Sequence, residues 1–213
     1  MKNFYNPIKR LIDILGAGFF LFCYSPMLIL SAIWIKITSP GPVFADIPAR
    51  VGKGGKPFRM YKLRTMIPKA HEYLLNHPDL HEKYKLNNYK LKPEEDPRII
   101  PGGRFLRRFS IDEAPQFLNI LRGQMSLVGP RAYYPFELEE QNKRNEGIEV
   151  FIKKATSIKP GLTGPWQVSG RTTIDFPGRV KMDAKYSENY SFLKDLLILF
   201  KTPWAVVAGR GAE

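Results

Sequence analysis

Residues 14–35 read ILGAGFFLFCYSPMLILSAIWI, a run of roughly 22 residues without a charged side chain, which suffices for a helix to cross a bilayer core. Asp13 precedes the run and Lys36 follows it. A cleavable signal peptide does not fit, because the run is too long and no cleavage site with small residues follows it. The run therefore predicts a membrane helix in preference to the core helix of a soluble protein.

Ser25 and Pro26 lie in the middle of this run. A proline inside a helix removes a backbone donor and clashes with the preceding turn, so we expect a kink or break there. The Ser25 hydroxyl can satisfy one freed carbonyl, which makes such a break tolerable in lipid. Basic residues flank both ends of the run, so charge does not place them on opposite sides. Residues 1–38 are predicted to form a re-entrant helix–break–helix segment, with a kinked spanning helix as the alternative.

The chain of 213 residues carries 33 Lys and Arg against 20 Asp and Glu, a formal net charge of +13. So basic a protein prefers anionic partners, which include nucleic acid, an acidic membrane surface and phosphorylated small molecules. A single cysteine excludes an internal disulfide. The sequence has no dinucleotide-binding glycine fingerprint, no P-loop and no zinc-type spacing of Cys and His. Any phosphate chemistry must therefore use another kind of site.

The second domain, residues 39–213, is predicted to be a small mixed α/β fold. Residues 43–45 and 58–63 are expected to be short strands, joined by the glycine-rich residues 52–56 in a hairpin-like connection. Residues 68–95 form a polar, helical segment on the surface. Residues 190–207 are apolar with scattered lysines, so they are expected either to pack on the core or to lie in the membrane interface.

An amphipathic helix is expected from Ser110 to Arg122, and it opens with Ser110-Ile111-Asp112-Glu113. Ser-x-x-Glu is the pattern of a capping box, and acids in a first turn complement the helix dipole, which is a purely structural interpretation. A helix start also keeps a carboxylate ionised and attracts phosphate, so an acid there can attack phosphorus or hold a divalent cation. These residues alone leave both interpretations open.

Cationic residues recur in short segments that glycine or proline punctuates, at residues 61–66, 96–98, 129–131 and 160–171. The planar guanidinium of arginine suits bidentate phosphate binding, and glycines expose backbone N–H groups to oxyanions. Each segment alone is a weak signal. Together with the acidic helix start and the membrane segment, they predict phosphoryl transfer to a lipid substrate.

The order of these segments resembles the bacterial sugar transferase family, the monotopic phosphoglycosyl transferases. The resemblance covers nearly the whole chain. The matching segments are the hydrophobic hairpin with Ser25-Pro26, KLRTM (62–66), DPRI (96–99), SIDEAPQ (110–116), NILRGQMSLVGPR (119–131) and PGLTGPWQVSGR (160–171). Ala132 departs from the family pattern, which usually has proline after Gly-Pro-Arg, and this local change does not touch a reacting group.

The resemblance implies a cytoplasmic catalytic domain half-sunk in the bacterial inner (cytoplasmic) membrane, with a re-entrant helix and amphipathic interfacial helices. It implies that Asp112 attacks the β-phosphate of a UDP-sugar, which gives a phosphosugar-aspartyl intermediate and releases UMP. Undecaprenyl phosphate or a similar polyprenyl phosphate then accepts the sugar phosphate. Glu113 would complete the dyad, and both carboxylates would hold Mg²⁺, a hard cation that prefers carboxylate oxygens.

For phosphate contacts the resemblance favours Arg98, Arg131 and Arg171, with Lys62 and Arg64 in support. It indicates galactose- or glucose-1-phosphate as the transferred group and inner-membrane lipid as a partner, but no nucleic acid, and it leaves a homodimer open. Two alternatives remain. One is a glycosyltransferase that releases UDP, and the other is a non-enzymatic basic module that binds the membrane.

Overall fold

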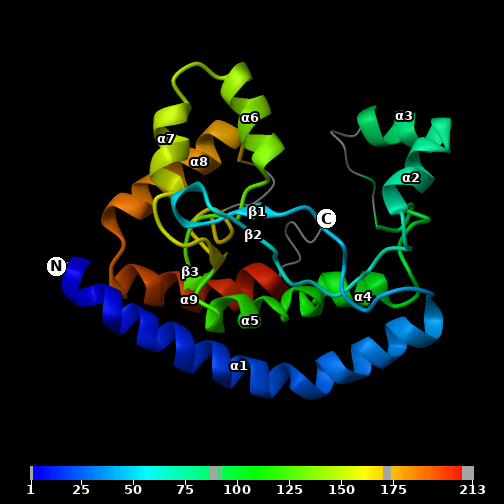
Figure 1. Cartoon of the computed structure of the whole chain (residues 1–213), viewed down its shortest axis with the longest axis horizontal. Coiled ribbons are helices and arrows are strands. Elements are labelled where there is room, and N and C mark those ends of the chain that lie inside the picture. The colour runs from blue at the N-terminus through cyan, green and yellow to red at the C-terminus, as the bar shows by residue number, and fades with distance from the viewer. Residues whose placement is uncertain (1, 87–90, 92, 170–173, 208–213) are drawn as a thin grey trace.

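The computed structural model describes residues 2–86, 91, 93–169 and 174–207. It confirms the mixed α/β class, with helices around two sheets of two strands each. Figure 1 shows the first helix as an arc beneath the rest of the chain, with two separate helical projections above it. The helices that follow the first are α2 (Ala70–Leu75), α3 (Pro78–Leu86), α4 (Gly103–Arg108), η2 (Ile111–Glu113), α5 (Gln116–Leu121), α6 (Pro135–Arg144), α7 (Glu149–Ala155), α8 (Phe176–Asn189) and α9 (Phe192–Val207).

The first helix, α1 (Lys2–Thr38), runs without interruption through Pro26. The predicted break is therefore wrong, and the helix bends instead, as its arc in Figure 1 shows. The predicted role of Ser25 is confirmed, because its Oγ donates a 2.7 Å hydrogen bond to the carbonyl of Phe22. Phe22 is four residues before Pro26, so this carbonyl is the one that the proline leaves without a donor.

Helix α1 is attached to the rest of the chain along its length. Near its start, Arg10 donates hydrogen bonds to the carbonyls of Ile120 and Leu121 at the end of α5. Near its end, the indole nitrogen of Trp34 donates to the carbonyl of Pro101 at 2.8 Å. Between them Phe20 stacks on Phe117 of α5 at 5.7 Å between ring centroids. Helix α1 is thus part of the fold and not a separate tether.

Two short sheets replace the longer strands that the sequence predicts. Strand β1 (Arg50–Val51) pairs antiparallel with β2 (Pro57–Phe58) around the 3₁₀ turn η1 (Lys53–Gly55), which confirms the hairpin. Strand β3 (Ser126–Val128) pairs in parallel with β4 (Gly161–Thr163).

The predicted strands at 43–45 and 58–63 meet only through one bridge, between Phe44 and Leu63. Their extent was overestimated because the backbone donors of the second segment bond elsewhere. The N–H of Tyr61 donates to the side chain of Asn119, and that of Leu63 donates to the carbonyl of Asp112.

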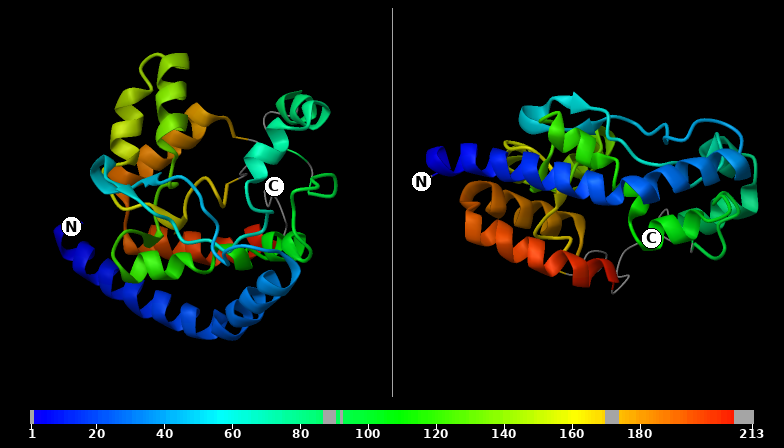
Figure 2. Two further views of the ribbon diagram at one scale, coloured as in Figure 1. Left: turned by 45° about the vertical axis from the view of Figure 1, so that its right-hand side comes forward. Right: turned by 90° about the horizontal axis from the view of Figure 1, so that it is seen from below.

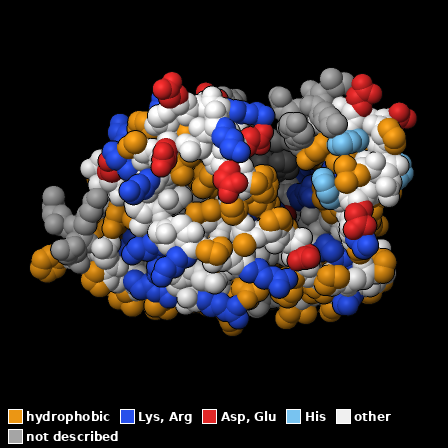
Figure 3. Space-filling model, turned by 45° about the horizontal axis from the view of Figure 1, so that its top comes forward, with side chains coloured by type: hydrophobic (Ala, Val, Ile, Leu, Met, Phe, Trp, Pro, Cys, Tyr) orange, Lys and Arg blue, Asp and Glu red, His pale blue; other side chains and the backbone are white. Residues whose placement is uncertain are grey.

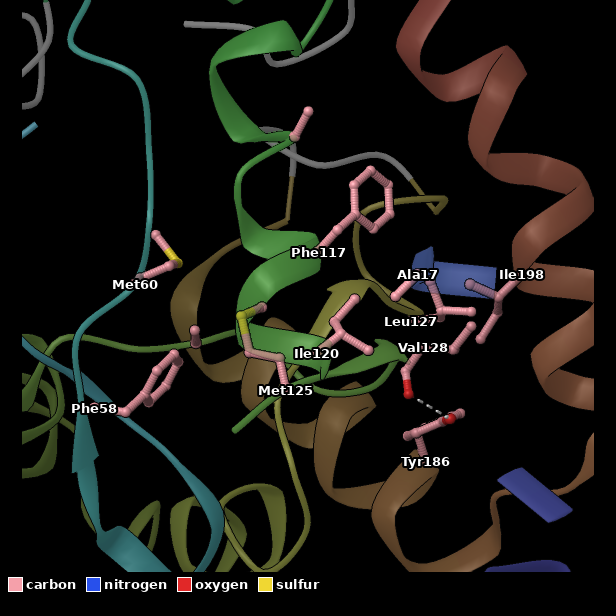
Figure 4. Close-up of a cluster of buried hydrophobic side chains, with 12 residues drawn as sticks. Ala17, Phe58, Met60, Phe117, Ile120, Met125, Leu127, Val128, Tyr186 and Ile198 are labelled. Atoms are coloured by element: carbon pink, nitrogen blue, oxygen red, sulfur yellow. Dashed lines mark hydrogen bonds between the residues drawn. The ribbon is translucent and has the colours of Figure 1, made fainter. Parts of the chain in front are cut away.

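The main hydrophobic core lies where α1, α5, α8, α9 and the two sheets meet, and Figure 4 shows its side chains converging from these elements. Its members include Ala17, Phe58, Met60, Phe117, Ile120, Met125, Leu127, Val128, Tyr186 and Ile198. Helix α9 confirms one expectation for residues 190–207, since Ile198 is buried in this core. The other expectation also holds in part, because much of α9 is exposed and apolar.

Candidate active site

The helix predicted for residues 110–122 is divided in two, the 3₁₀ turn η2 and the helix α5. The capping-box interpretation is wrong. Ser110 adopts a left-handed conformation with φ of 54°, and its side chain makes no capping hydrogen bond. The division follows from Pro115, which has no N–H to continue a helical ladder. The acidic pair therefore lies on a tight turn that is strained at Ser110.

Asp112 is buried on this turn, with 1% of its surface exposed. The ammonium group of Lys62 lies 2.9 Å from Asp112 Oδ2 and 3.2 Å from Glu113 Oε1. Lys62 reaches both carboxylates because the N–H of its neighbour, Leu63, bonds to the carbonyl of Asp112 at 2.9 Å. The site therefore consists of one buried carboxylate, one half-exposed carboxylate and a lysine that contacts both.

Burial raises the pKa of Asp112, although the nearby charges of Lys62 and Arg107 act in the opposite direction. The sequence suggested that a helix start would favour the ionised form of this carboxylate. In the structure it is the positive charge of Lys62 that favours the ionised form. Burial also acts to lower the pKa of Lys62, but the two carboxylates outweigh it and the net shift is upward. A raised lysine pKa keeps the cation charged beside the dyad.

Arg107 is a cation of this site that the sequence analysis missed. Its Nε donates to Thr65 Oγ1 at 2.9 Å, and it is close enough for its charge to lower the pKa of Asp112. Its two terminal nitrogens make no hydrogen bond within the part of the chain that the structure describes. The run RFLRRF (104–109) shows several arginines, but the sequence does not reveal which of them faces Asp112.

Two arginines predicted to bind phosphate are engaged within the protein. Arg64 is buried and donates to the carbonyls of Ser39, Pro42 and Met66 and to the Ser39 hydroxyl, so it holds the turn after α1.

Arg98 is buried too and forms a bidentate pair with Asp96, with both side-chain contacts at 2.8 Å. Burial acts to raise the pKa of Asp96, but the hydrogen bonds from Arg98 prevail and lower it. Both arginines therefore stabilise the fold through contacts within the protein.

Arg131 follows β3, at the place where β3 and β4 approach most closely. A Cβ on Gly164 would lie 2.1 Å from the Gly129 carbonyl, so only glycine fits there. The guanidinium of Arg131 lies 5.1 Å from the ring centroid of Trp166. Arg171, the last predicted phosphate ligand, lies outside the described residues. The Nε of Arg131 is buried and makes no hydrogen bond within the described residues, so among the predicted cations that the structure describes it differs from Arg64 and Arg98.

The backbone of Arg131 is fixed by Asp183 of α8, which is fully buried. Asp183 Oδ2 accepts hydrogen bonds from the Arg131 N–H at 2.9 Å and from the Tyr133 hydroxyl at 2.7 Å. Its Oδ1 has no partner among the described residues. Burial raises the pKa of Asp183 to about 7, against the lowering effect of these bonds and of the charges on Arg131 and Arg179.

The residues present fit a divalent cation that arrives with its substrate. No group of three or more His, Cys, Asp or Glu side chains that could hold a metal occurs in the described part of the chain. Asp112 and Glu113 supply two hard oxygen ligands with Lys62 between them. Mg²⁺ commonly binds through one or two carboxylates together with substrate phosphates, so a pair of carboxylates suffices.

An apolar layer adjoins the site. Seen from below, α1, α9 and α4 lie side by side (Figure 2). Their exposed side chains include Phe4, Leu15, Phe19, Phe22, Leu30 and Ile37 of α1, Phe105 of α4, and Leu193, Leu197, Phe200 and Trp204 of α9. A soluble surface rarely exposes so many large apolar residues together. On another side, Figure 3 shows basic side chains in a hollow beside the α2–α3 projection.

The site thus has a buried carboxylate with a lysine partner, next to an apolar layer. The chain belongs to the bacterial sugar transferase family, whose model matches residues 4–209. This confirms the resemblance seen in the sequence.

Three relatives illustrate the match. The chain is 39% identical over 208 residues to the exopolysaccharide production protein ExoY of Rhizobium meliloti, covering 96% of this chain and 87% of that protein. It is 38% identical over 209 residues to the undecaprenyl-phosphate galactose phosphotransferase of Salmonella typhimurium, covering 96% and 41%. It is 33% identical over 212 residues to the UDP-N-acetylgalactosamine-undecaprenyl-phosphate N-acetylgalactosaminephosphotransferase of Aeromonas hydrophila, covering 98% and 46%. The chain thus spans less than half of the second and third.

Replacing Lys62 by methionine keeps an apolar side chain of similar length and removes the charge. We expect the rate of sugar transfer to fall by about 100-fold or more, because an anionic substrate then meets two uncompensated carboxylates. Lys62→Arg, the charged control, should lose less. The measurement is initial rate per folded protein, with folding checked by thermal unfolding. A Lys62→Met rate within about twofold of the parent would contradict this account.

Asp183 should make stability depend on pH. Its carboxyl binds a proton more tightly in the folded chain than in the unfolded one, so stability falls as pH rises from about 4 to about 7. The upper limit is about 1.4 kcal/mol per pH unit. Asp183→Asn, which cannot ionise, should lose this component, so the melting temperature of the parent minus that of the variant should decrease between pH 5 and pH 8. A difference independent of pH would refute the assignment.

Proposed function

We propose that this protein transfers a sugar-1-phosphate from a UDP-sugar to undecaprenyl phosphate or a similar polyprenyl phosphate. The observation that carries the proposal is the buried Asp112, whose charge Lys62 offsets at 2.9 Å within a site of the sugar transferase family. Two of the relatives are named as phosphotransferases that act on undecaprenyl phosphate, which supports the acceptor. The galactose in one name agrees with the predicted galactose- or glucose-1-phosphate, whereas the other name contains N-acetylgalactosamine.

In the first step a carboxylate oxygen of Asp112 attacks the β-phosphorus of the UDP-sugar. The bond between this phosphorus and the oxygen that bridges to the α-phosphate breaks, and UMP leaves with that oxygen. A phosphosugar-aspartyl ester remains on the enzyme. Lys62 and Arg107 lie where they can neutralise the charge that develops on the transferred phosphate, and such preorganised charges are the main source of catalysis in phosphoryl transfer.

In the second step an oxygen of the polyprenyl phosphate attacks the phosphorus of the ester. The bond to Asp112 breaks, the carboxylate is restored, and a polyprenyl diphosphate sugar is released. Glu113 is more exposed than Asp112, so it is the carboxylate that can meet the acceptor or its proton. Mg²⁺, held by Asp112 and Glu113, would offset charge on the diphosphate of the donor.

Helix α1 supports a re-entrant arrangement at the cytoplasmic face of the inner membrane. It is apolar over a long window and mostly unburied, which suits contact with lipid. Both its beginning, at Arg10, and its end, at Trp34, bond to the same polar body. A straight spanning helix would place these two ends on opposite sides of the hydrocarbon core. The basic net charge also suits anionic lipid headgroups.

The nucleotide that is released tests the proposal. Purified protein in nanodiscs with Mg²⁺, undecaprenyl phosphate and a panel of UDP-sugars should release UMP with one sugar or a few related ones. Asp112→Asn should abolish release, since an amide cannot act as the nucleophile. Glu146→Gln, which removes an exposed carboxylate on the loop between α6 and α7, is the matched control and should retain the parent rate. Release of UDP would instead indicate a glycosyltransferase, and no release with any donor would favour a binding module.

Membrane topology can be tested with single cysteines at the two ends of α1. In a Cys23→Ala background, Lys2→Cys and Pro40→Cys should both resist a membrane-impermeant maleimide added to intact spheroplasts. Both should react once the membrane is opened. Labelling of only one of the two in intact spheroplasts would mean that the helix spans the bilayer.

A further inference from the structure

Two exposed aromatic side chains, on α4 and at its C-terminal end, lie just before η2, the turn that carries Asp112. Phe105 and Phe109, one helical turn apart, are 52% and 47% exposed, and their ring centroids lie 4.8 Å apart. Phe109 precedes Asp112 by three residues. No other described part of the chain brings large exposed apolar side chains so near to Asp112 in sequence.

Another side of α4 packs against the second half of α1. Leu106 is buried in a cluster with Ile35 of α1 and with Ile111 of η2. At the start of α4, Gly102 has a φ of 78°, and a Cβ there would lie 2.6 Å from the indole nitrogen of Trp34. This glycine lets the Trp34 ring lie directly on the turn. Helix α4 thus packs on the second half of α1, near which Figure 1 shows it, and leads directly into η2.

Two arginines lie between the rings of the aromatic pair in the chain. Arg107 is directed into the site, where it bonds to Thr65 and influences Asp112. The guanidinium of Arg108 lies 5.8 Å from the ring centroid of Phe109. Helix α4 therefore combines exposed phenyl rings with an arginine whose charge acts on Asp112. A phosphate attached to a long hydrocarbon chain combines the complementary apolar and anionic parts.

We propose that Phe105 and Phe109 bind the isoprenoid chain of the acceptor next to its phosphate, so that the phosphate is presented to Arg107 and to the ester on Asp112. This inference rests on the proposed function. Bulk phospholipid is a weaker occupant, because α1 and α9 already provide a broad apolar layer, and neither of these helices carries Arg107. The ring pair differs from that layer in its place on α4 and just after it, beside Arg107 in the chain and just before Asp112.

The reaction has two half-reactions, and the proposal concerns only the second. The first needs the UDP-sugar alone and is followed, without acceptor, by exchange of labelled UMP into the UDP-sugar. The second consumes the acceptor and is followed by the product formed as a function of its concentration. A chain-binding surface should affect the second and leave the first intact.

The test uses the full chain in nanodiscs with the double substitution Phe105→Ala/Phe109→Ala. The KM for undecaprenyl phosphate should rise about tenfold or more, as expected for loss of two apolar contacts, while UMP exchange stays within about twofold. Phe105→Leu/Phe109→Leu should recover most of the affinity, because the contact is apolar. Phe200→Ala, the control, removes an exposed ring of the apolar layer on α9 and should leave this KM within about twofold.

Other outcomes would overturn the proposal. An unchanged KM in the double variant would show that the rings do not contact the acceptor. A parallel loss of UMP exchange and of transfer would show that α4 serves membrane attachment or folding. An equal effect from Phe200→Ala would assign the contact to bulk lipid. Absence of UMP exchange in the parent protein would refute the proposed function itself, and the two failures are thus distinguishable.

Discussion

The ion pair between Lys62 and Asp112 is the interaction on which the site depends. A buried carboxylate is costly unless a cation compensates it, and removing one partner of such a pair is strongly destabilising. The pair forms because the segment around Lys62 is bonded to η2 and to α5. Asn119, which is fully buried, accepts a hydrogen bond from the N–H of Tyr61 and donates to the carbonyl of Arg59. These backbone hydrogen bonds hold Lys62 next to Asp112. A flexible surface lysine would compensate the buried carboxylate less well.

The same helix, α5, also connects the site to the long apolar helix α1. One face of α5 carries Asn119 toward the Lys62 segment, whereas its C-terminal carbonyls accept hydrogen bonds from Arg10 of α1. Asp13 of α1 adds a second connection, since its Oδ1 accepts bonds from the side chain of Ser126 and from the N–H of the next residue in β3. The position of α1 and the position of the acidic pair are therefore coupled through one short helix.

Features that depend on a few adjacent residues could be predicted from the sequence. Examples are the apolar run, the hydrogen bond of Ser25 to a carbonyl that the following proline leaves free, and the family motif around Asp112. Features that depend on distant partners could not. The residue pattern around Lys62 predicts a strand. In the structure, however, the N–H of Tyr61 bonds to Asn119 of α5 and the N–H of Leu63 bonds to the carbonyl of Asp112. Likewise, Arg64 and Arg107 look alike in sequence, yet one bonds to the turn after α1 and the other faces Asp112, because only the tertiary fold decides which surface each occupies.

The most direct test of the central claim is peptide-level mass spectrometry of protein mixed with its UDP-sugar and Mg²⁺, without acceptor, and quenched in acid. The account predicts that the peptide containing Asp112 gains the mass of a sugar phosphate, and that this adduct disappears when polyprenyl phosphate is added before the quench. An adduct on a different residue would contradict the account. So would sustained formation of product with no adduct at any time of quenching, because that result would mean a direct transfer in which Asp112 never becomes covalently modified.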